Sequence, residues 1–75
     1  MDYKQAVFEI FRRNKITGPG LQLPWNVIIG ELVALPGYDA KACKQAIDAM
    51  VADGTLTTTE RRDRFFLGQD IGEGQ

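Results

Sequence analysis

The sequence predicts a small α+β domain in which three helices are followed by a β-hairpin. Apolar residues recur at helical spacing in three segments, and turns containing glycine and proline separate these segments. After residue 54 the pattern changes to β-branched and aromatic residues, which are typical of strands. A chain of 75 residues can build one small hydrophobic core. We therefore expect a single domain over residues 1–68 and a disordered tail over residues 69–75, which has little to bury.

The first predicted helix covers residues 2–14. Arg12 and Arg13 fall in its last turn, where they suit the negative end of the helix dipole. A turn at 17–20 ends the helix, and residues 21–23 then alternate with the period of a very short strand. The apolar face of this helix carries Tyr3, Ala6, Val7, Ile10 and Phe11.

The second predicted helix begins at Pro24, whose missing N–H group costs nothing in a first turn, and it ends before the Pro36–Gly37 pair. Gly30 lowers helix propensity by about 1 kcal/mol relative to alanine, and its small size would allow close packing against a neighbouring helix. We expect Trp25 to be a core residue rather than a platform for a ligand. The apolar stripe of this helix comprises Trp25, Ile28, Ile29, Leu32 and Leu35.

The third predicted helix runs from its N-cap, Asp39, to residue 53. Gly54 follows at the position where a left-handed residue closes a helix. The Asp53–Gly54 pair could also form a hairpin turn, but the long periodic run before it favours the helix cap. The predicted buried face of the helix carries Cys43, Ala46, Ile47, Met50 and Val51.

Two strands, at residues 55–59 and 64–67, are predicted to pair as a hairpin through the polar turn at 60–63. Phe66 then lies on the face of the hairpin that points away from the helices. The short strand at 21–23 would pair with the inner edge of the hairpin and satisfy its backbone groups. The side chains expected to face the helices are Leu56, Phe65 and Leu67.

This order of elements resembles that of the winged helix-turn-helix family over residues 3–68, nearly the whole chain. Residues 46–56 look like the exit of the family's recognition helix, where an apolar helix ends at glycine and a leucine starts the first wing strand. Phe65 and Leu67 are similar to the residues that end the family's second wing strand. The resemblance implies a three-helix winged helix-turn-helix fold whose C-terminal β-hairpin is the wing.

The resemblance also implies a DNA-binding surface. In winged-helix proteins the exposed face of the third helix enters the major groove, and the hairpin tip reaches the backbone or the minor groove. Lysine can contact guanine or phosphate, glutamine can pair with adenine, and arginine suits phosphate or a narrow minor groove. Carried over to this sequence, the positions are Lys41, Lys44, Gln45, Asp48, Arg61, Arg62 and Arg64. The expected partner is double-stranded DNA, and the expected role is that of a small bacterial or phage transcriptional regulator.

The charge of the chain is compatible with this surface but does not require it. The formal net charge is −1, and omission of Asp2, Asp70 and Glu73 leaves nine basic and seven acidic residues. Asp48 would repel phosphate from the middle of the predicted surface. The same charges could also form the solvated face of a domain that does not bind DNA.

The alternative is a protein-interaction module, or adaptor, that does not bind DNA. Winged-helix domains also serve in that role, and a symmetric homodimer is a further possibility. Exposed apolar residues would seed such contacts. The candidates are Phe8, Val27 and Phe66.

No enzymatic activity, metal site or cofactor is predicted. The chain has no histidine, and its single cysteine, Cys43, falls on the buried stripe of the third helix, where an inert thiol is expected. The glycine turn at 18–20 lacks the Lys–Ser/Thr pair that phosphate binding requires. No segment reaches the length of about 18 apolar residues expected of a membrane span, and the N-terminus lacks the layout of a signal peptide. The expected location is therefore the cytoplasm.

Overall fold

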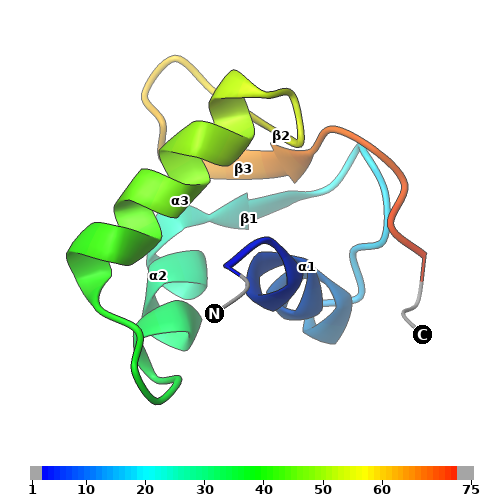
Figure 1. Ribbon diagram of the computed structural model, residues 1–75. Helices are drawn as coiled ribbons and strands as arrows, with labels where there is room; N and C mark the ends of the chain where they lie inside the picture. The colour runs from blue at the N-terminus through cyan, green and yellow to red at the C-terminus, as the bar shows by residue number, and fades with distance from the viewer. Residues whose placement is uncertain (1–2, 73–75) are drawn as a thin grey trace.

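Three helices and a three-stranded antiparallel sheet make up the computed structural model, which describes residues 3–72 (Figure 1). The elements follow one another as α1 (Tyr3–Arg13), β1 (Gln22–Pro24), α2 (Trp25–Val33), α3 (Ala40–Ala52), β2 (Leu56–Thr58) and β3 (Arg64–Leu67). The predicted α+β class is confirmed. Every predicted helix and strand forms, with ends shifted by at most two residues.

β3 is the central strand of the sheet, with β1 on one side and β2 on the other. Leu23 lies opposite Phe65 in the β1–β3 pair, and Leu56 lies opposite Leu67 in the β2–β3 pair. All four side chains are buried on the same face, because alternate residues of a strand point to the same side of a sheet. The prediction that the short strand pairs with the hairpin is therefore confirmed.

The core lies between the three helices and one face of the sheet (Figure 1). Cys43, Ile47 and Met50 point inward from α3, as predicted, and this leaves the opposite side of the helix exposed. The largest fully buried side chains are Phe11, Phe65, Ile28, Leu32, Ile47, Leu56, Leu67, Val7 and Cys43. Every helix and both hairpin strands therefore contribute to one continuous core.

Phe8 is buried, with only 5% of its surface exposed, so the prediction that it could contact a partner is wrong. α1 contacts both α2 and α3, and Ile71 packs against the same core. With neighbours on several sides, α1 buries Val7 and Phe8 as well as Ile10 and Phe11. The buried face of α1 is therefore wider than a single apolar stripe.

The chain after β3 returns toward α1 and contacts it (Figure 1). The backbone N–H of Ile71 donates a hydrogen bond to the Thr17 carbonyl oxygen at 2.7 Å. The Arg12 guanidinium donates to the carbonyl oxygens of Ile71 and Gly72 at 3.4 and 3.3 Å. These contacts correct the expectation of a disordered tail as far as residue 72, and residues 73–75 of that tail lie outside the described residues.

Both ends of α3 are closed as predicted. Asp39 Oδ1 accepts a hydrogen bond from the backbone N–H of Ala42 at 3.0 Å, and Asp39 is thus the N-cap. At the other end Gly54 adopts a left-handed φ of 87°, and its N–H donates to the Val51 carbonyl oxygen at 3.3 Å. The two caps fix the length of α3 and the point at which the chain turns into the hairpin.

Gly30 lies in open space. Within residues 3–72, no atom beyond the local backbone of α2 lies within 4 Å of a Cβ atom built on it, so the expectation that it allows close packing against a neighbouring helix is wrong. α2 instead turns Ile28 and Leu32 toward the core, and Gly30 lies among the exposed positions of the helix.

Candidate functional site

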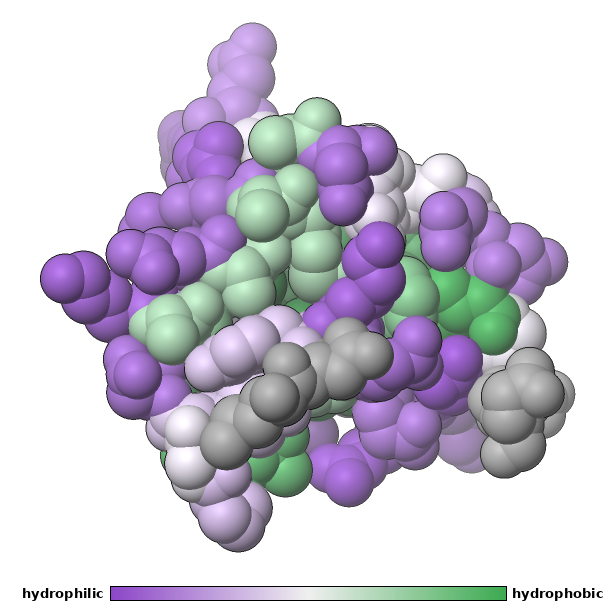
Figure 2. Space-filling model, viewed as in Figure 1, coloured by the Kyte–Doolittle hydropathy of each residue, from purple (hydrophilic) through white to green (hydrophobic). Residues whose placement is uncertain are grey.

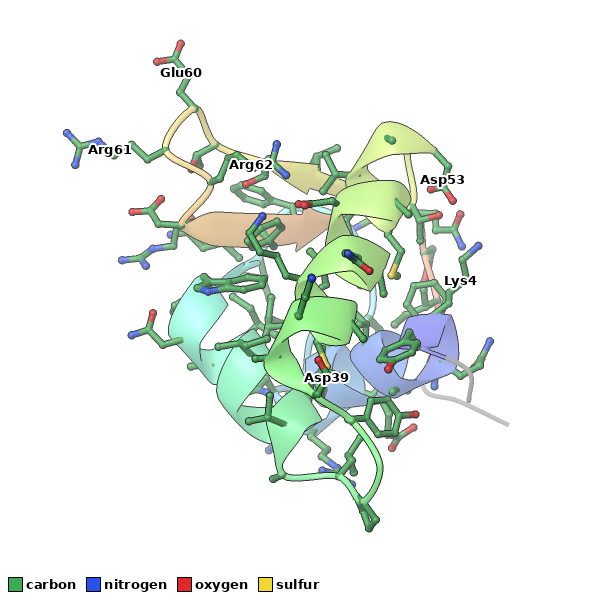
Figure 3. All side chains as sticks on the ribbon, turned by 60° about the vertical axis from the view of Figure 1, so that its left-hand side comes forward. Lys4, Asp39, Asp53, Glu60, Arg61 and Arg62 are labelled. Atoms are coloured by element: carbon green, nitrogen blue, oxygen red, sulfur yellow. The ribbon has the colours of Figure 1, made fainter. Side chains whose placement is uncertain are left out.

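The exposed side of α3 and the loop of the hairpin lie next to each other on one side of the molecule (Figure 3). Lys41, Lys44 and Gln45 are exposed on α3, and Arg61 and Arg62 are exposed in the loop. Residues predicted from two separate parts of the chain therefore share one surface. We call it the α3–hairpin face, and it consists of Lys41, Lys44, Gln45, Asp48, Arg61 and Arg62. Arg64, the remaining predicted contact, alternates along β3 with the buried Phe65, so its side chain points to the other side of the sheet.

The loop between β2 and β3 is held in one conformation by its own hydrogen bonds. The Arg62 N–H donates to the Thr59 carbonyl oxygen at 3.0 Å, and Thr59 Oγ1 donates to Asp63 Oδ1 at 3.0 Å. Arg62 adopts a left-handed φ of 59°, which few residues other than glycine adopt. At the base of the loop, the Trp25 N–H donates to the Asp63 carbonyl oxygen at 2.9 Å. This bond ties the hairpin to the first residue of α2.

Asp48 lies at the centre of the α3–hairpin face and joins its two halves. Its Oδ2 atom accepts from Lys44 Nζ at 3.1 Å, and its Oδ1 atom accepts from Arg62 Nη2 at 2.6 Å. The hydrogen bond from Lys44, together with the contacts of Arg62, lowers the pKa of the Asp48 carboxyl, which is therefore ionised at neutral pH. All three side chains remain accessible, with exposed fractions of 66% for Lys44, 51% for Arg62 and 42% for Asp48.

An open pocket of about 230 Å³ lies beside these three residues. Trp25 and Phe65 line it with aromatic rings whose centroids are 5.6 Å apart and whose planes meet at 46°. Lys44, Asp48 and Arg62 line the remainder. The expectation that Trp25 belongs to the core is therefore only partly right, because it is half-buried and also forms a wall of this pocket. The apolar spacing of α2 could not reveal this second role.

Two other cations of the face have no acidic partner. Among residues 3–72, neither Lys41 nor Arg61 forms an ion pair. Figure 3 shows Glu60 and Arg61 projecting from the tip of the loop, while Arg62 turns toward α3. Arg64 Nη1 donates to the Asp63 carbonyl oxygen at 3.4 Å. Lys41 and Arg61 can therefore meet an anionic partner without breaking an ion pair.

Alanine occupies much of the remaining outer surface of α3. Ala40, Ala49 and Ala52 are exposed, and Figure 2 shows a pale, weakly apolar band along the helix with hydrophilic side chains beside it. Because alanine side chains neither donate nor accept hydrogen bonds, polar contacts from α3 fall to the residues of the α3–hairpin face.

The predicted apolar contact residues are less accessible than expected. Val27 packs against the core, and Phe66 is half-buried on the outer face of the sheet. The exposed large apolar residues within residues 3–72 are Leu21, at 59%, and Val33, at 41%. The alternation of residues 21–23 does not distinguish the exposed Leu21 from the buried Leu23, whereas the position of Val33 outside the apolar stripe of α2 is a signal that could have identified it.

Within residues 3–72, no cluster of three or more potential metal-ligating side chains is present. None of the helices in this part of the chain is long and apolar enough to cross a bilayer. Cys43 is buried, and burial raises the pKa of its thiol, so the thiolate that reacts with electrophiles is disfavoured.

Comparisons of the chain with models of known protein families, with curated proteins and with solved structures found no match. The fold class rests on the helices and the sheet of the chain itself. A function can accordingly be inferred only from the chemistry of its surface, where the α3–hairpin face gathers most of the predicted site residues.

Proposed function

We propose that the protein is a winged-helix DNA-binding protein, with α3 in the major groove and the hairpin on the backbone or in the minor groove. The observation that carries this proposal is that cations from α3 and from the hairpin lie on one exposed face, where Asp48 bridges them. The element order and the position of β1 beside β3 support the winged-helix assignment. A role in transcriptional regulation, in a bacterial or phage cytoplasm, is part of the same proposal.

The polar residues of the face would divide the work of recognition. Gln45 is exposed on α3 beside two lysines, and a glutamine amide can pair with the edge of adenine. Lys41 can reach guanine or phosphate. Arg61 carries a guanidinium group, whose paired donors match phosphate oxygens, and Arg64 offers a second one from the outer side of the sheet. The contacts with phosphate would hold the protein on the duplex, and the contacts with base edges would read its sequence.

The charges of residues 39–64 set an upper limit on the salt dependence of DNA binding. Residues 39–64 carry five basic and five acidic residues. If all five cations contacted phosphate, the slope of log affinity against log salt would be about −4.5 and no steeper. We therefore expect binding to be readily detected at low salt and weak at physiological salt.

Arg61→Gln is the variant that tests this function most simply. It removes a cation that makes no ion pair within the described part of the chain, so we expect weaker binding and a salt slope shallower by about 0.9. The measurement is fluorescence anisotropy of a labelled random-sequence duplex over a series of salt concentrations. Lys4→Gln is the matched control, because Lys4 is an exposed cation on α1, away from Arg61 (Figure 3).

Two outcomes would count against DNA binding by this face. If the unmodified protein shows no salt-sensitive association with the duplex pool, the proposed function is wrong. If Arg61→Gln and Lys4→Gln weaken binding equally, the duplex is attracted by overall charge and the α3–hairpin face has no special role.

A second candidate function is a protein-interaction module or homodimer without DNA binding. The exposure of Leu21 and Val33 favours it, since apolar side chains at the surface gain from being covered by a partner. A dimer found by sedimentation and dissociated by Val33→Ser, in a protein that does not bind duplex, would favour this function over the first.

A further inference from the structure

We propose that Lys44 and Arg62 form a site for one phosphate group of the DNA backbone, and that Asp48 fills this site in the unbound protein. Asp48 is then an internal competitor of the phosphate, and it lowers the affinity for DNA. This inference rests on the proposed function and adds a defined anion site within the α3–hairpin face.

The geometry of the three side chains supports the exchange of one anion for another. The two cations come from different elements, and each meets a different oxygen of the carboxylate: Lys44 Nζ at 3.1 Å and Arg62 Nη2 at 2.6 Å. A phosphodiester likewise shares one negative charge between two non-bridging oxygens, and it accepts the same charge-assisted hydrogen bonds. A phosphate placed between α3 and the hairpin would thus find both donors already converging.

The exposure of the three side chains makes that exchange possible. Lys44, Asp48 and Arg62 keep between 42% and 66% of their side-chain surface accessible to water. Ion pairs that are this exposed contribute little net stability, because water and salt compete for both partners. The phosphate can therefore displace Asp48 without unfolding any element, and the main obstacle is the carboxylate charge that remains nearby.

The alternative is that Asp48 positions Arg62 for DNA binding. In that arrangement its carboxylate would hold Arg62 in the orientation that DNA needs, and its removal would weaken binding. The two roles predict changes of opposite sign, so removal of the charge distinguishes them.

Asp48→Asn and Asp48→Ala are the informative variants, tested by anisotropy with the random-sequence duplex. We expect about three- to tenfold tighter binding at low salt, and a salt slope steeper by about 0.9 to 1.8, because one or two cations become available to phosphate. Alanine is a good helix former, and therefore Asp48→Ala provides a folded variant even if Asn destabilises α3.

Glu31→Gln is the matched control. It adds the same unit of net charge and releases Arg13 from an ion pair at 3.8 Å, but this pair joins α1 and α2. We expect Glu31→Gln to change the slope much less than Asp48→Asn. Equal gains from both variants would show a general charge effect and would overturn the inference.

Arg62→Gln completes the test as a double-variant cycle. We expect it to weaken binding more in the Asp48→Asn background than in the unmodified protein, where Arg62 is already occupied by Asp48.

If the unmodified protein binds duplex and Asp48→Asn binds no better, the inference is wrong and the proposed function stands. If neither protein binds at any salt concentration, the proposed function is wrong and the inference falls with it. If Asp48→Asn binds duplex and the unmodified protein does not, the inference is supported, because Asp48 then blocks binding completely.

Discussion

Gly68 and Gly30 have opposite surroundings, although both are glycines at exposed positions. A Cβ atom at Gly68 would overlap the backbone oxygen of Gly54, and the Gly68 N–H donates to the Thr55 carbonyl oxygen at 2.8 Å. This close approach of two chain segments pins the end of β3 to the start of β2. An added methyl group at Gly30 would meet no atom of the described residues within 4 Å beyond the local backbone of α2.

Substitution of each glycine by alanine should therefore change stability in opposite directions. Gly68→Ala should lower the free energy of unfolding by about 1–3 kcal/mol, because a backbone atom must move. Gly30→Ala should raise it by about 0.8–1.0 kcal/mol, the difference in helix propensity. Urea denaturation followed by the fluorescence of Trp25, the single tryptophan, measures both changes. A Gly68→Ala protein with the same free energy of unfolding as the unmodified protein would contradict the close approach of the two strands.

Arg61 and Arg62 are neighbours in the sequence but have different roles in the structure. Arg61 projects from the loop, whereas Arg62, with its left-handed backbone, extends its side chain to Asp48 (Figure 3). The sequence presents them as equivalent loop arginines. The difference arises from loop hydrogen bonds, such as that from Thr59 to Asp63, which amino-acid type and spacing do not reveal.

At the scale of elements, the junction of α3 and β2 depends on a carboxylate. Asp53 Oδ1 accepts a hydrogen bond from the Thr55 N–H at 2.8 Å, and hydrogen bonding to Thr55 lowers the pKa of Asp53. Asp48, on the same helix, also has a lowered pKa, caused first by its hydrogen bond from Lys44. Both carboxylates bind protons less readily in the folded chain than in the unfolded one.

This shift predicts how stability depends on pH. The stabilisation from Asp53 and Asp48 should be fully present above their ordinary pKa of about 3.9, and it should be lost as the pH falls through their lower folded values. The urea midpoint should therefore decrease below about pH 4, with a smaller decrease for Asp53→Asn, whose amide oxygen can accept the hydrogen bond but does not titrate. An equal decrease in both proteins between neutral pH and about pH 3 would contradict a role for Asp53 in acid sensitivity.

The elements themselves could be predicted because their causes are local. The period of apolar residues along α3, the Asp39 cap and Gly54 at the exit all act over a few residues, and each appears in the structure as expected. The width of the buried face of α1 could not be predicted in this way. Phe8 lies on a helix that contacts α2 and α3, and Ile71 packs against the same core; none of these neighbours is encoded within residues 3–13.

At the scale of the whole molecule, the residues of the candidate site could be predicted from the sequence, but the contacts that join them could not. The six residues of the α3–hairpin face were expected from the sequence, and five of them are exposed, whereas Arg64, also expected there, points to the other side of the sheet. Their central feature, the contact of Asp48 with Arg62, joins residues 14 positions apart and depends on how the hairpin is placed against α3. The Trp25 wall of the adjoining pocket likewise depends on α2 and β3 meeting there.

Chemical-shift mapping of the ¹⁵N-labelled protein, titrated at low salt with the random-sequence duplex, tests the proposed DNA-binding face most directly. We predict that the largest changes fall within residues 41–48 of α3 and 60–64 of the hairpin, and that added salt reverses them. Lys4 on α1 and the exposed α2 residue Val33 should shift little. Changes centred on α1 or on Val33, or no change at any salt concentration, would contradict DNA binding through the α3–hairpin face.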